Sequence, residues 1–168
     1  PYHNRFLNLD SSFPPIVCYA LMQDKNGSIW IGTSNGLYEY SKRAKRFVHY
    51  GTENGLPNNV VCGLGQSKNG DIWCSTYNGI CKLDHFTHEI ICYYSGNGLF
   101  DKQYLTGVYC QDASGYIYFG SIHGITKFMP DSIVMKHPLQ RPLLTHLFIN
   151  NKEVSAGSMI NDKLISDD

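Results

Sequence analysis

The sequence has no surplus of charge of one sign and no long apolar segment. Its 168 residues contain 14 Lys and Arg against 14 Asp and Glu, which gives a formal net charge of zero at pH 7. A balanced chain produces no overall field that would attract nucleic acid, so we expect no nucleic-acid partner for this segment. No apolar run approaches the roughly 18 residues of a membrane-spanning helix, and no signal peptide is recognisable. The chain opens at Pro1 without an initiator methionine, so we expect a piece of a longer protein that meets a membrane only through its parent.

Motifs of catalytic and metal centres are missing as well. No serine stands in a G-x-S-x-G turn, and the glycine-rich residues 51–55 lack the lysine and the following helix of a phosphate-binding loop. His85 and His88 have a spacing that could suit a metal, but they flank a predicted hairpin, which is typical of a solvated turn. We therefore predict no catalytic residue, no metal and no cofactor.

Six cysteines are present, but no two form the C-x-x-C pair of a zinc ribbon or a thioredoxin-like protein. Most lie in apolar, strand-like runs such as residues 90–93, which favours buried free thiols that behave as small hydrophobic residues. Disulfides are the alternative in an oxidising compartment, and the sequence does not reveal which cysteines would pair. The six are Cys18, Cys62, Cys74, Cys81, Cys92 and Cys110.

An internal repeat dominates what is present. The segment DKNGSIWIGTSNGL at 24–37 returns as SKNGDIWCSTYNGI at 67–80 and as DASGYIYFGSIHGI at 112–125. Trp30 and Trp73 are 43 residues apart, and Tyr118 follows 45 residues after Trp73. Agreement at so many positions indicates a repeat architecture, in which each copy forms one structural unit.

Each repeat is predicted to form four short strands. In the second copy, β-prone runs at 59–66, 72–76, 80–83 and 89–94 alternate with turn residues. Asn-Gly between apolar runs favours a type I′ hairpin, because that turn needs positive φ at both central residues. Four-stranded antiparallel units of this length are typical of propeller blades, whereas a helical repeat would space its apolar residues by 3.6. We predict an all-β fold made of β-propeller blades.

The repeat predicts about three blades' worth of strands in an incomplete ring. We place an outer strand at 5–9, complete blades at 16–50 and 59–94, and three strands of a last blade at 105–128, together a partial propeller over 1–130. Closed rings typically have four to eight blades, so we expect the chain to join the rest of a parent propeller or to self-associate. In 131–168, prolines and an alternating apolar run predict a linker and the first strand of a following β domain.

These residues resemble the repeat of the two-component regulator propeller family. The resemblance rests on the G-x-I-W-I-G-T-x-x-G-L pattern at 27–37, the N-G-L-P segment at 54–57 and a final repeat that ends at 128–130. It covers roughly residues 5–155, and the segment at 142–154 is similar to the lead-in of the Ig-like domain that follows such propellers. Tyr118 in place of tryptophan is one departure, which suits the same site in a terminal blade.

The resemblance implies a function in signal transduction. Members of that family form the periplasmic sensor region of membrane-spanning hybrid two-component histidine kinases, common in gut Bacteroides, that detect glycans and activate polysaccharide-utilisation genes. By resemblance, this chain is a non-catalytic periplasmic sensor segment that binds a glycan and relays the signal across the membrane. Two other classes stay open, a structural or protein-binding propeller segment and a fragment of a propeller carbohydrate-active enzyme.

The antiparallel strand order of a blade assigns candidate ligand residues to one face. Turns between the second and third strands share this face with the blade-to-blade connections, including the longer loops at 52–59 and 95–104. Such loops are suited to hydrogen-bonding and stacking on a sugar. Asparagine also serves turns because it tolerates positive φ, whereas turn chemistry explains Tyr77 and His123 less well. The predicted ligand-binding set is Asn35, Asn58, Tyr77, Asn78, Tyr104 and His123.

Two further groups are predicted to be structural. Trp30 and Trp73 occupy the same repeat position in mid-strand, so we expect them to pack between blades rather than to serve as sugar platforms. The basic run at 42–46 is expected to be a solvated hairpin, with a contact for another domain as the alternative.

Overall fold

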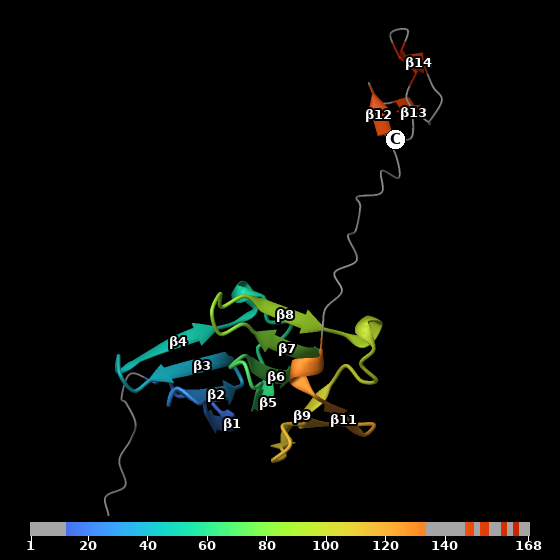
Figure 1. Cartoon of the computed structure of the whole chain (residues 1–168). Coiled ribbons are helices and arrows are strands. Elements are labelled where there is room, and N and C mark those ends of the chain that lie inside the picture. The colour runs from blue at the N-terminus through green and yellow to red at the C-terminus, as the bar shows by residue number, and fades with distance from the viewer. Residues whose placement is uncertain (1–12, 134–146, 150–151, 155–158, 161–162, 165–168) are drawn as a thin grey trace, which may run out of the picture. The chain divides into compact units, whose positions relative to one another are not determined.

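The chain is built from short antiparallel β-strands (Figure 1). A computed structural model describes residues 13–133, together with four short strands nearer the C-terminus. The chain divides into two compact units, Pro1–Val134 and Met135–Asp168. In these described segments the only helical elements are three single 3-10 turns, so the predicted all-β class is confirmed.

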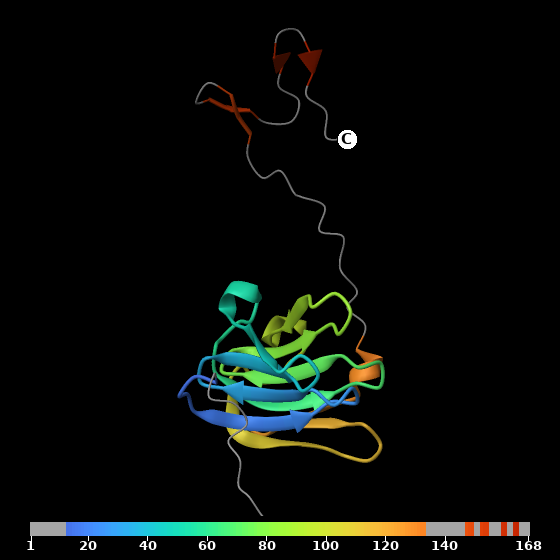
Figure 2. The ribbon, with the colours of Figure 1, turned by 90° about the vertical axis from the view of Figure 1, so that its left-hand side faces the viewer.

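The first unit contains three antiparallel sheets that repeat along the chain (Figures 1 and 2). Their strand orders are β1-β2-β3-β4, β5-β6-β7-β8 and β11-β10-β9, so each strand pairs with its neighbour in sequence, as in a propeller blade. The blades are confirmed, and within the described residues they do not close a ring. The strands are β1 Cys18–Gln23, β2 Ile29–Thr33, β3 Gly36–Ser41, β4 Arg46–Tyr50, β5 Val61–Gln66, β6 Ile72–Thr76, β7 Gly79–Leu83, β8 Ile90–Tyr93, β9 Tyr104–Gln111, β10 Ile117–Ser121 and β11 Ile125–Phe128, and the 3-10 turns are η1 Thr52–Asn54, η2 Ser95–Asn97 and η3 Pro130–Ser132.

The turn between the second and third strands is built in the same way in the first two blades. Thr33 Oγ1 donates to the Gly36 carbonyl (2.8 Å) and accepts a backbone N–H of the turn (3.0 Å). Thr76 makes the same two bonds around Gly79, at 3.1 and 3.0 Å. Both glycines have φ near +105°, and a Cβ on either would lie within 2.5 Å of a carbonyl oxygen. Only glycine fits there, so the sequence pattern T-x-x-G fixes this turn.

Neighbouring blades approach most closely along their innermost strands β1, β5 and β9. A Cβ on Gly63 would lie 2.7 Å from the Cβ of Tyr109, and one on Gly65 would lie 2.6 Å from Ile117 Cδ1. Glycine at these two positions therefore lets the third blade approach the second. Tyr109 extends as far as the first blade, where its hydroxyl accepts from the N–H of Leu21 (3.2 Å) and donates to its carbonyl (3.3 Å).

A glutamine at the end of each later innermost strand links one blade to the one before it. Gln66 Oε1 accepts the backbone N–H of Lys25 in the first blade (3.0 Å). One blade later, Gln111 accepts the backbone N–H of Gln66 (3.1 Å) and donates to its carbonyl (2.7 Å). The repeat thus carries its own inter-blade connector.

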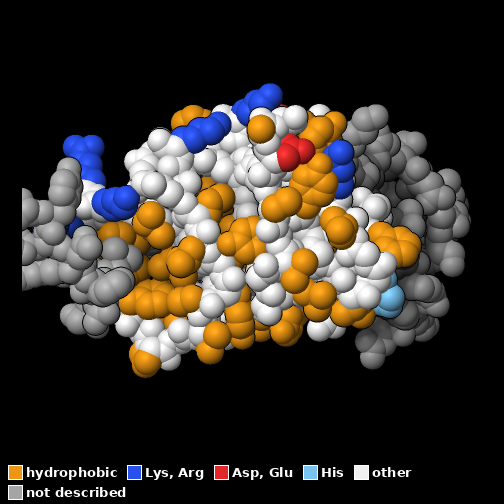
Figure 3. Space-filling view, turned by 90° about the horizontal axis from the view of Figure 1, so that it is seen from below, with side chains coloured by type: hydrophobic (Ala, Val, Ile, Leu, Met, Phe, Trp, Pro, Cys, Tyr) orange, Lys and Arg blue, Asp and Glu red, His pale blue; other side chains and the backbone are white. Residues whose placement is uncertain are grey.

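Apolar side chains stay exposed on the first and third blades, and many lie on the face shown in Figure 3. Leu21 on β1 is 62% exposed, whereas its repeat equivalent Leu64 on β5 is 2% exposed and belongs to the core shared by the first two blades. Val108 on β9 and Ile125 on β11 are exposed as well. Coverage of these faces by the rest of a propeller, or by self-association, stays a prediction.

The ends of the chain were predicted to hold an outer strand and the start of another domain. The outer strand at 5–9 lies outside the described residues. In the second unit, β12 (Leu147–Ile149) pairs with β13 (Lys152–Val154), and β14 (Met159–Ile160) pairs with β15 (Lys163–Leu164). Two pairs of short strands are thus described in the region where a linker and a first strand were predicted. The Ig-like assignment stays a prediction.

The cysteines correct one expectation. Cys81 on β7 and Cys92 on β8 are directly opposite each other, with Cα atoms 4.2 Å apart, and form a disulfide. The expectation of free thiols was wrong for this pair, because cross-strand register brings the two side chains together on one face of the sheet. Cys62 and Cys74 are buried free thiols, and burial raises the pKa of each to about 12. The other two cysteines are exposed and free.

Candidate functional site

The face that carries the blade-to-blade links, here called the loop face, is held together by backbone hydrogen bonds. The Gly36 N–H donates to the carbonyl of Asn59 (2.6 Å), and the Gly79 N–H donates to the carbonyl of Lys102 (2.7 Å). Each bond ties a β2–β3-type turn to the link that leads into the next blade. The loop face therefore comprises the turns 34–35, 77–78 and 122–123 with the links 51–60 and 94–103.

A pocket of about 200 Å³ opens on the loop face between the second and third blades. It is lined by Asn78, Gly79, Tyr94, Ser95 and Lys102. Tyr77, next in sequence to Asn78, is 40% exposed. The pocket is smaller than the roughly 300–1,000 Å³ of whole-ligand sites, so it suits one group of a larger ligand that continues over the surface.

A carboxylate–imidazole pair lies in the same part of the loop face. Asp101, almost fully buried, accepts from the backbone N–H of His123 (3.3 Å) and lies 2.9 Å from its ring Nδ1. The ring itself is 65% exposed. Ser121 Oγ lies beside this carboxylate and the Gly124 carbonyl (3.0 Å), and its single hydrogen serves one acceptor at a time. The hydrogen bond from Ser121, followed by that from His123, holds the pKa of Asp101 well below its usual range.

The remaining predicted ligand residues lie in different environments. Asn35 is exposed in the first blade, and its carbonyl lies 2.7 Å from Nε2 of His49. Asn58 is half-buried, and its Oδ1 accepts the N–H of Val60 (2.8 Å), which is a turn contact. Tyr104 has no exposed surface and its hydroxyl lies 3.0 Å from Thr126 Oγ1, so burial removes it from the candidate surface. Tyr77, Asn78 and His123 are left as exposed predicted residues of the second and third blades, and of these Asn78 lines the pocket.

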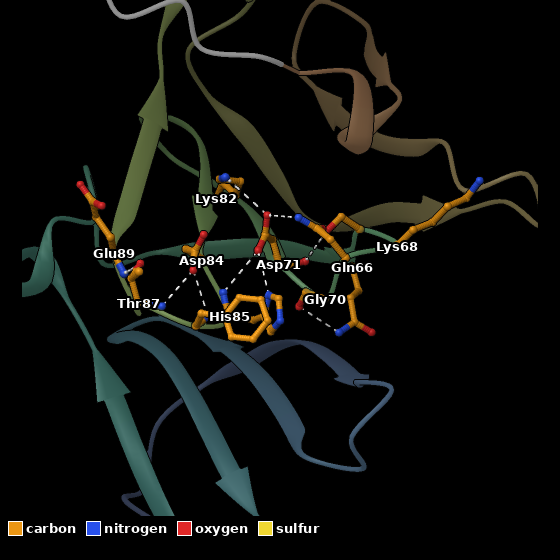
Figure 4. A network of polar contacts seen from close by, with 12 residues as sticks. Gln66, Lys68, Gly70, Asp71, Lys82, Asp84, His85, Thr87 and Glu89 are labelled. Atoms are coloured by element: carbon orange, nitrogen blue, oxygen red, sulfur yellow. Dashed lines mark hydrogen bonds and ion pairs between the residues drawn. The ribbon is translucent and has the colours of Figure 1, made fainter.

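Sequence reasoning missed a polar network at the other end of the second blade (Figure 4). The buried carboxylate of Asp71 lies 3.1 Å from His85 Nδ1 and 3.4 Å from Lys82 Nζ, and it accepts from Asn69 Nδ2 (2.9 Å). Burial raises the pKa of Asp71, but the hydrogen bonds from His85 and Asn69 outweigh it and lower the pKa. Asp84 lies close enough to share a metal with Asp71 and His85, and the ion pair of Lys82 with Asp71 offsets one of the two carboxylate charges.

The two histidines that flank the β7–β8 hairpin have separate partners. His85 belongs to the Asp71 network, and the ring of His88 lies 2.8 Å (Nδ1) from the hydroxyl of Tyr50 in the first blade. Residues 86–89 are exposed, as expected of a solvated turn, but each histidine also contacts a residue outside the hairpin. Nothing in the local sequence distinguishes these partners.

The two tryptophans pack between blades as predicted. Trp30 (4% exposed) belongs to the core shared by the first two blades, and Trp73 (2% exposed) contacts Phe128 of the third blade. Within its own blade, Trp30 stacks on Tyr50 and Trp73 on Tyr93. Their indole N–H groups differ. Trp30 Nε1 donates to Asp24 Oδ2 (2.9 Å), whereas Trp73 Nε1 has no hydrogen-bond partner among the described residues. The repeat explains the difference, because serine replaces the aspartate at position 67 of the second blade.

Comparisons with known proteins agree with this architecture. Residues 12–35 match the family described as two component regulator propeller. The chain is similar to the extracellular domain of the putative hybrid two component system BT3049 from B. thetaiotaomicron, with a TM-score of 0.67 and 29% identity over 76% of this chain and 18% of that chain. The extracellular domain of the putative hybrid two component system BT4673 from B. thetaiotaomicron has a TM-score of 0.63 and 21% sequence identity, over 76% of this chain and 17% of that chain. A streptogramin B lyase shares the fold, with a TM-score of 0.56 and 21% sequence identity over 76% of this chain and 42% of that chain.

These matches confirm the resemblance that the repeat indicated, but they cover only part of each similar protein. The chain spans less than a fifth of each of the two extracellular domains. No curated protein matches the sequence. A search of the described residues finds no helix with the length and apolar character needed to cross a membrane.

Proposed function

We propose that this chain is part of the extracytoplasmic sensor region of a hybrid two-component system. The observation that carries the proposal is the similarity to the extracellular domain of the BT3049 system, which extends over three quarters of the chain. In this proposal the segment is non-catalytic and lies in the periplasm. The parent protein is a histidine kinase that passes the signal across the inner membrane.

The loop face is the proposed contact for a glycan. Asn78 and Lys102 line the pocket, and the exposed ring of Tyr77 belongs to the same turn as Asn78. Donors and acceptors of this kind pair with sugar hydroxyls, and an aromatic ring covers the apolar face of a sugar. His123, with its ring oriented by Asp101, adds a further donor or acceptor on the same face.

A calorimetric titration of the 168-residue chain with a panel of neutral and acidic oligosaccharides tests this proposal. We expect at least one oligosaccharide to bind and Tyr77→Ala to weaken its binding by about tenfold, which corresponds to the loss of one stacking contact. Phe86→Ala is the matched control, because Phe86 is an exposed aromatic residue (82%) on the β7–β8 hairpin, away from the loop face. Equal effects of the two substitutions, or no binding by any sugar, would contradict the proposal.

The same titration separates the sensor from the two other classes. A sensor binds an oligosaccharide and leaves it intact, whereas a propeller enzyme releases shorter products that chromatography detects. A purely structural segment binds no sugar at all. The coding sequence around the chain gives an independent check, because the proposal requires a transmembrane segment and a kinase domain in the parent protein.

A further inference from the structure

Two hairpins of this chain share one backbone conformation but differ in charge. In the β3–β4 hairpin, the Lys45 N–H donates to the carbonyl of Ser41 (2.7 Å), and Lys45 has a φ of 50°. In the β7–β8 hairpin, 43 residues later, the His88 N–H donates to the carbonyl of Asp84 (2.9 Å), and His88 has a φ of 58°. The second hairpin is thus an internal reference that shows what the turn itself requires.

The turn requires an oxygen-bearing side chain at its first position. Ser41 Oγ accepts the N–H of Ala44 (3.2 Å), and Asp84 Oδ1 accepts the N–H of Thr87 (2.9 Å). It does not require cations, because residues 84–89 of the second hairpin contain neither Lys nor Arg. The positive charges of the first hairpin therefore have no part in forming the turn.

The first hairpin nevertheless concentrates four cations in five positions. Figure 3 shows basic side chains at the end of the molecule where this hairpin lies. All four are exposed, and no carboxylate of the described residues lies within ion-pair distance of them. Like charges this close repel one another, so the cluster is unfavourable for folding unless a partner neutralises it. The four are Lys42, Arg43, Lys45 and Arg46.

A groove of about 460 Å³ leads from this hairpin along the outer strands of the first blade. Arg46 lines it on the hairpin side, Val48 provides an apolar wall, and Tyr50 and His88 provide polar ring atoms. Glu39 also lines the groove, and its carboxylate has no hydrogen-bond or ion-pair partner among the described residues. This volume is within the range of ligand sites, roughly 300–1,000 Å³.

We propose that the hairpin and groove, here called the rim site, bind an acidic polysaccharide that carries carboxylate or sulfate groups. The hairpin cations bind the anionic groups, and the Glu39 carboxylate accepts hydrogen bonds from sugar hydroxyls while Val48 contacts the ring. Glu39 repels the anionic groups of any polyanion, but a saccharide also offers hydroxyl donors to the Glu39 carboxylate, whereas a polyanion without hydroxyl groups offers none, so this lining favours a saccharide. The hairpin of the rim site lies at the opposite end of the blade from the loop face, because successive turns of an antiparallel sheet alternate ends, and the groove leads from it along β4 toward Tyr50. The rim site goes beyond the proposed function.

Binding of the 168-residue chain to dextran sulfate, polygalacturonate and neutral dextran tests the rim site. We expect both acidic polymers to bind, neutral dextran not to bind, and the affinity for dextran sulfate to fall at least tenfold between roughly 50 and 300 mM salt because the charges are screened. The double substitution Lys42→Gln with Arg43→Gln should weaken binding at least tenfold. The control double substitution, Lys68→Gln with Lys127→Gln, removes the same amount of charge elsewhere on the chain. It should change the affinity for the acidic polymers less than twofold. Equal losses in the two double variants, or equal binding of neutral dextran, would overturn the rim site.

Glu39→Gln distinguishes a saccharide from an acidic polypeptide. For polygalacturonate we expect weaker binding, because the amide replaces a charged acceptor of hydroxyl hydrogen bonds. For polyglutamate we expect stronger binding, because a repulsive charge is removed. Polyglutamate that binds the unsubstituted chain as tightly as polygalacturonate would overturn the saccharide assignment. Tyr77→Ala should leave binding at the rim site unchanged, so the experiment can refute the rim site and the loop-face proposal independently. Circular dichroism verifies that every variant is folded.

Discussion

Replacement of each tryptophan by phenylalanine should affect stability very differently, although the two occupy the same repeat position. Both indoles are buried, so both substitutions lose a similar packing area. Trp30→Phe also removes the hydrogen bond to the Asp24 carboxylate, which contributes about 1.5–3 kcal/mol for a charged acceptor, and the low end applies because Asp24 is half-buried. Trp73→Phe removes an N–H that has no partner among the described residues, which recovers about 1 kcal/mol of desolvation.

The two variants should therefore differ by about 2–3 kcal/mol in the free energy of unfolding, with Trp30→Phe the less stable. Urea unfolding measures this difference, and a gap of about 1 M or more between the two midpoints is expected for a chain of this size. The chain has only two tryptophans, so each variant keeps one fluorescent reporter, in a known blade. Far-UV circular dichroism supplies the common probe.

A double-mutant cycle between Asp24→Asn and Trp30→Phe is the control. It should give a coupling energy of at least about 1 kcal/mol, because both substitutions remove the same hydrogen bond. Equal stability of Trp30→Phe and Trp73→Phe, or a coupling energy near zero, would refute the assignment of the hydrogen bond as the cause.

Three further predictions concern the disulfide, the inter-blade connector and the loop face. Replacement of Cys81 and Cys92 by serine should cost about 3 kcal/mol, because the disulfide closes a loop with a sequence separation of 11, and thermal unfolding with and without reductant measures this. Gln111→Ala should cost about 2 kcal/mol and speed amide exchange in the third blade, because it leaves the N–H and carbonyl of Gln66 unpaired. Asp101 has a lowered pKa when folded, so it stabilises the fold above its unfolded pKa near 4, and this contribution is lost as the pH falls through the folded pKa. Asp101→Asn should flatten that acid dependence in urea titrations between about pH 2 and 6.

The blades could be predicted from the sequence because local patterns determine them. Each strand is short, and the turns depend on residues such as Gly36 and Gly79, whose positive φ leaves no alternative to glycine. Repetition of the pattern three times makes the assignment secure, since a chance match would not recur at a spacing of 43 and 45 residues. Boundaries were less certain. The third blade begins at Tyr104 instead of 105, so Tyr104 belongs to strand β9, where its side chain is buried, and not to the exposed loop before it.

The sequence alone determined that this chain is a series of antiparallel propeller blades, with candidate ligand residues at one end of each blade, because that information lies within a few residues of each turn. Tertiary structure alone decided which side chains meet. Cys81 lies opposite Cys92, Asp71 binds His85, and Asp101 orients His123 only when strands and links from separate segments are in register. Such contacts depend on distances between residues far apart in sequence, and a one-dimensional pattern does not contain those distances. The physical environment of each blade, rather than its repeat position, thus decides what its side chains can do.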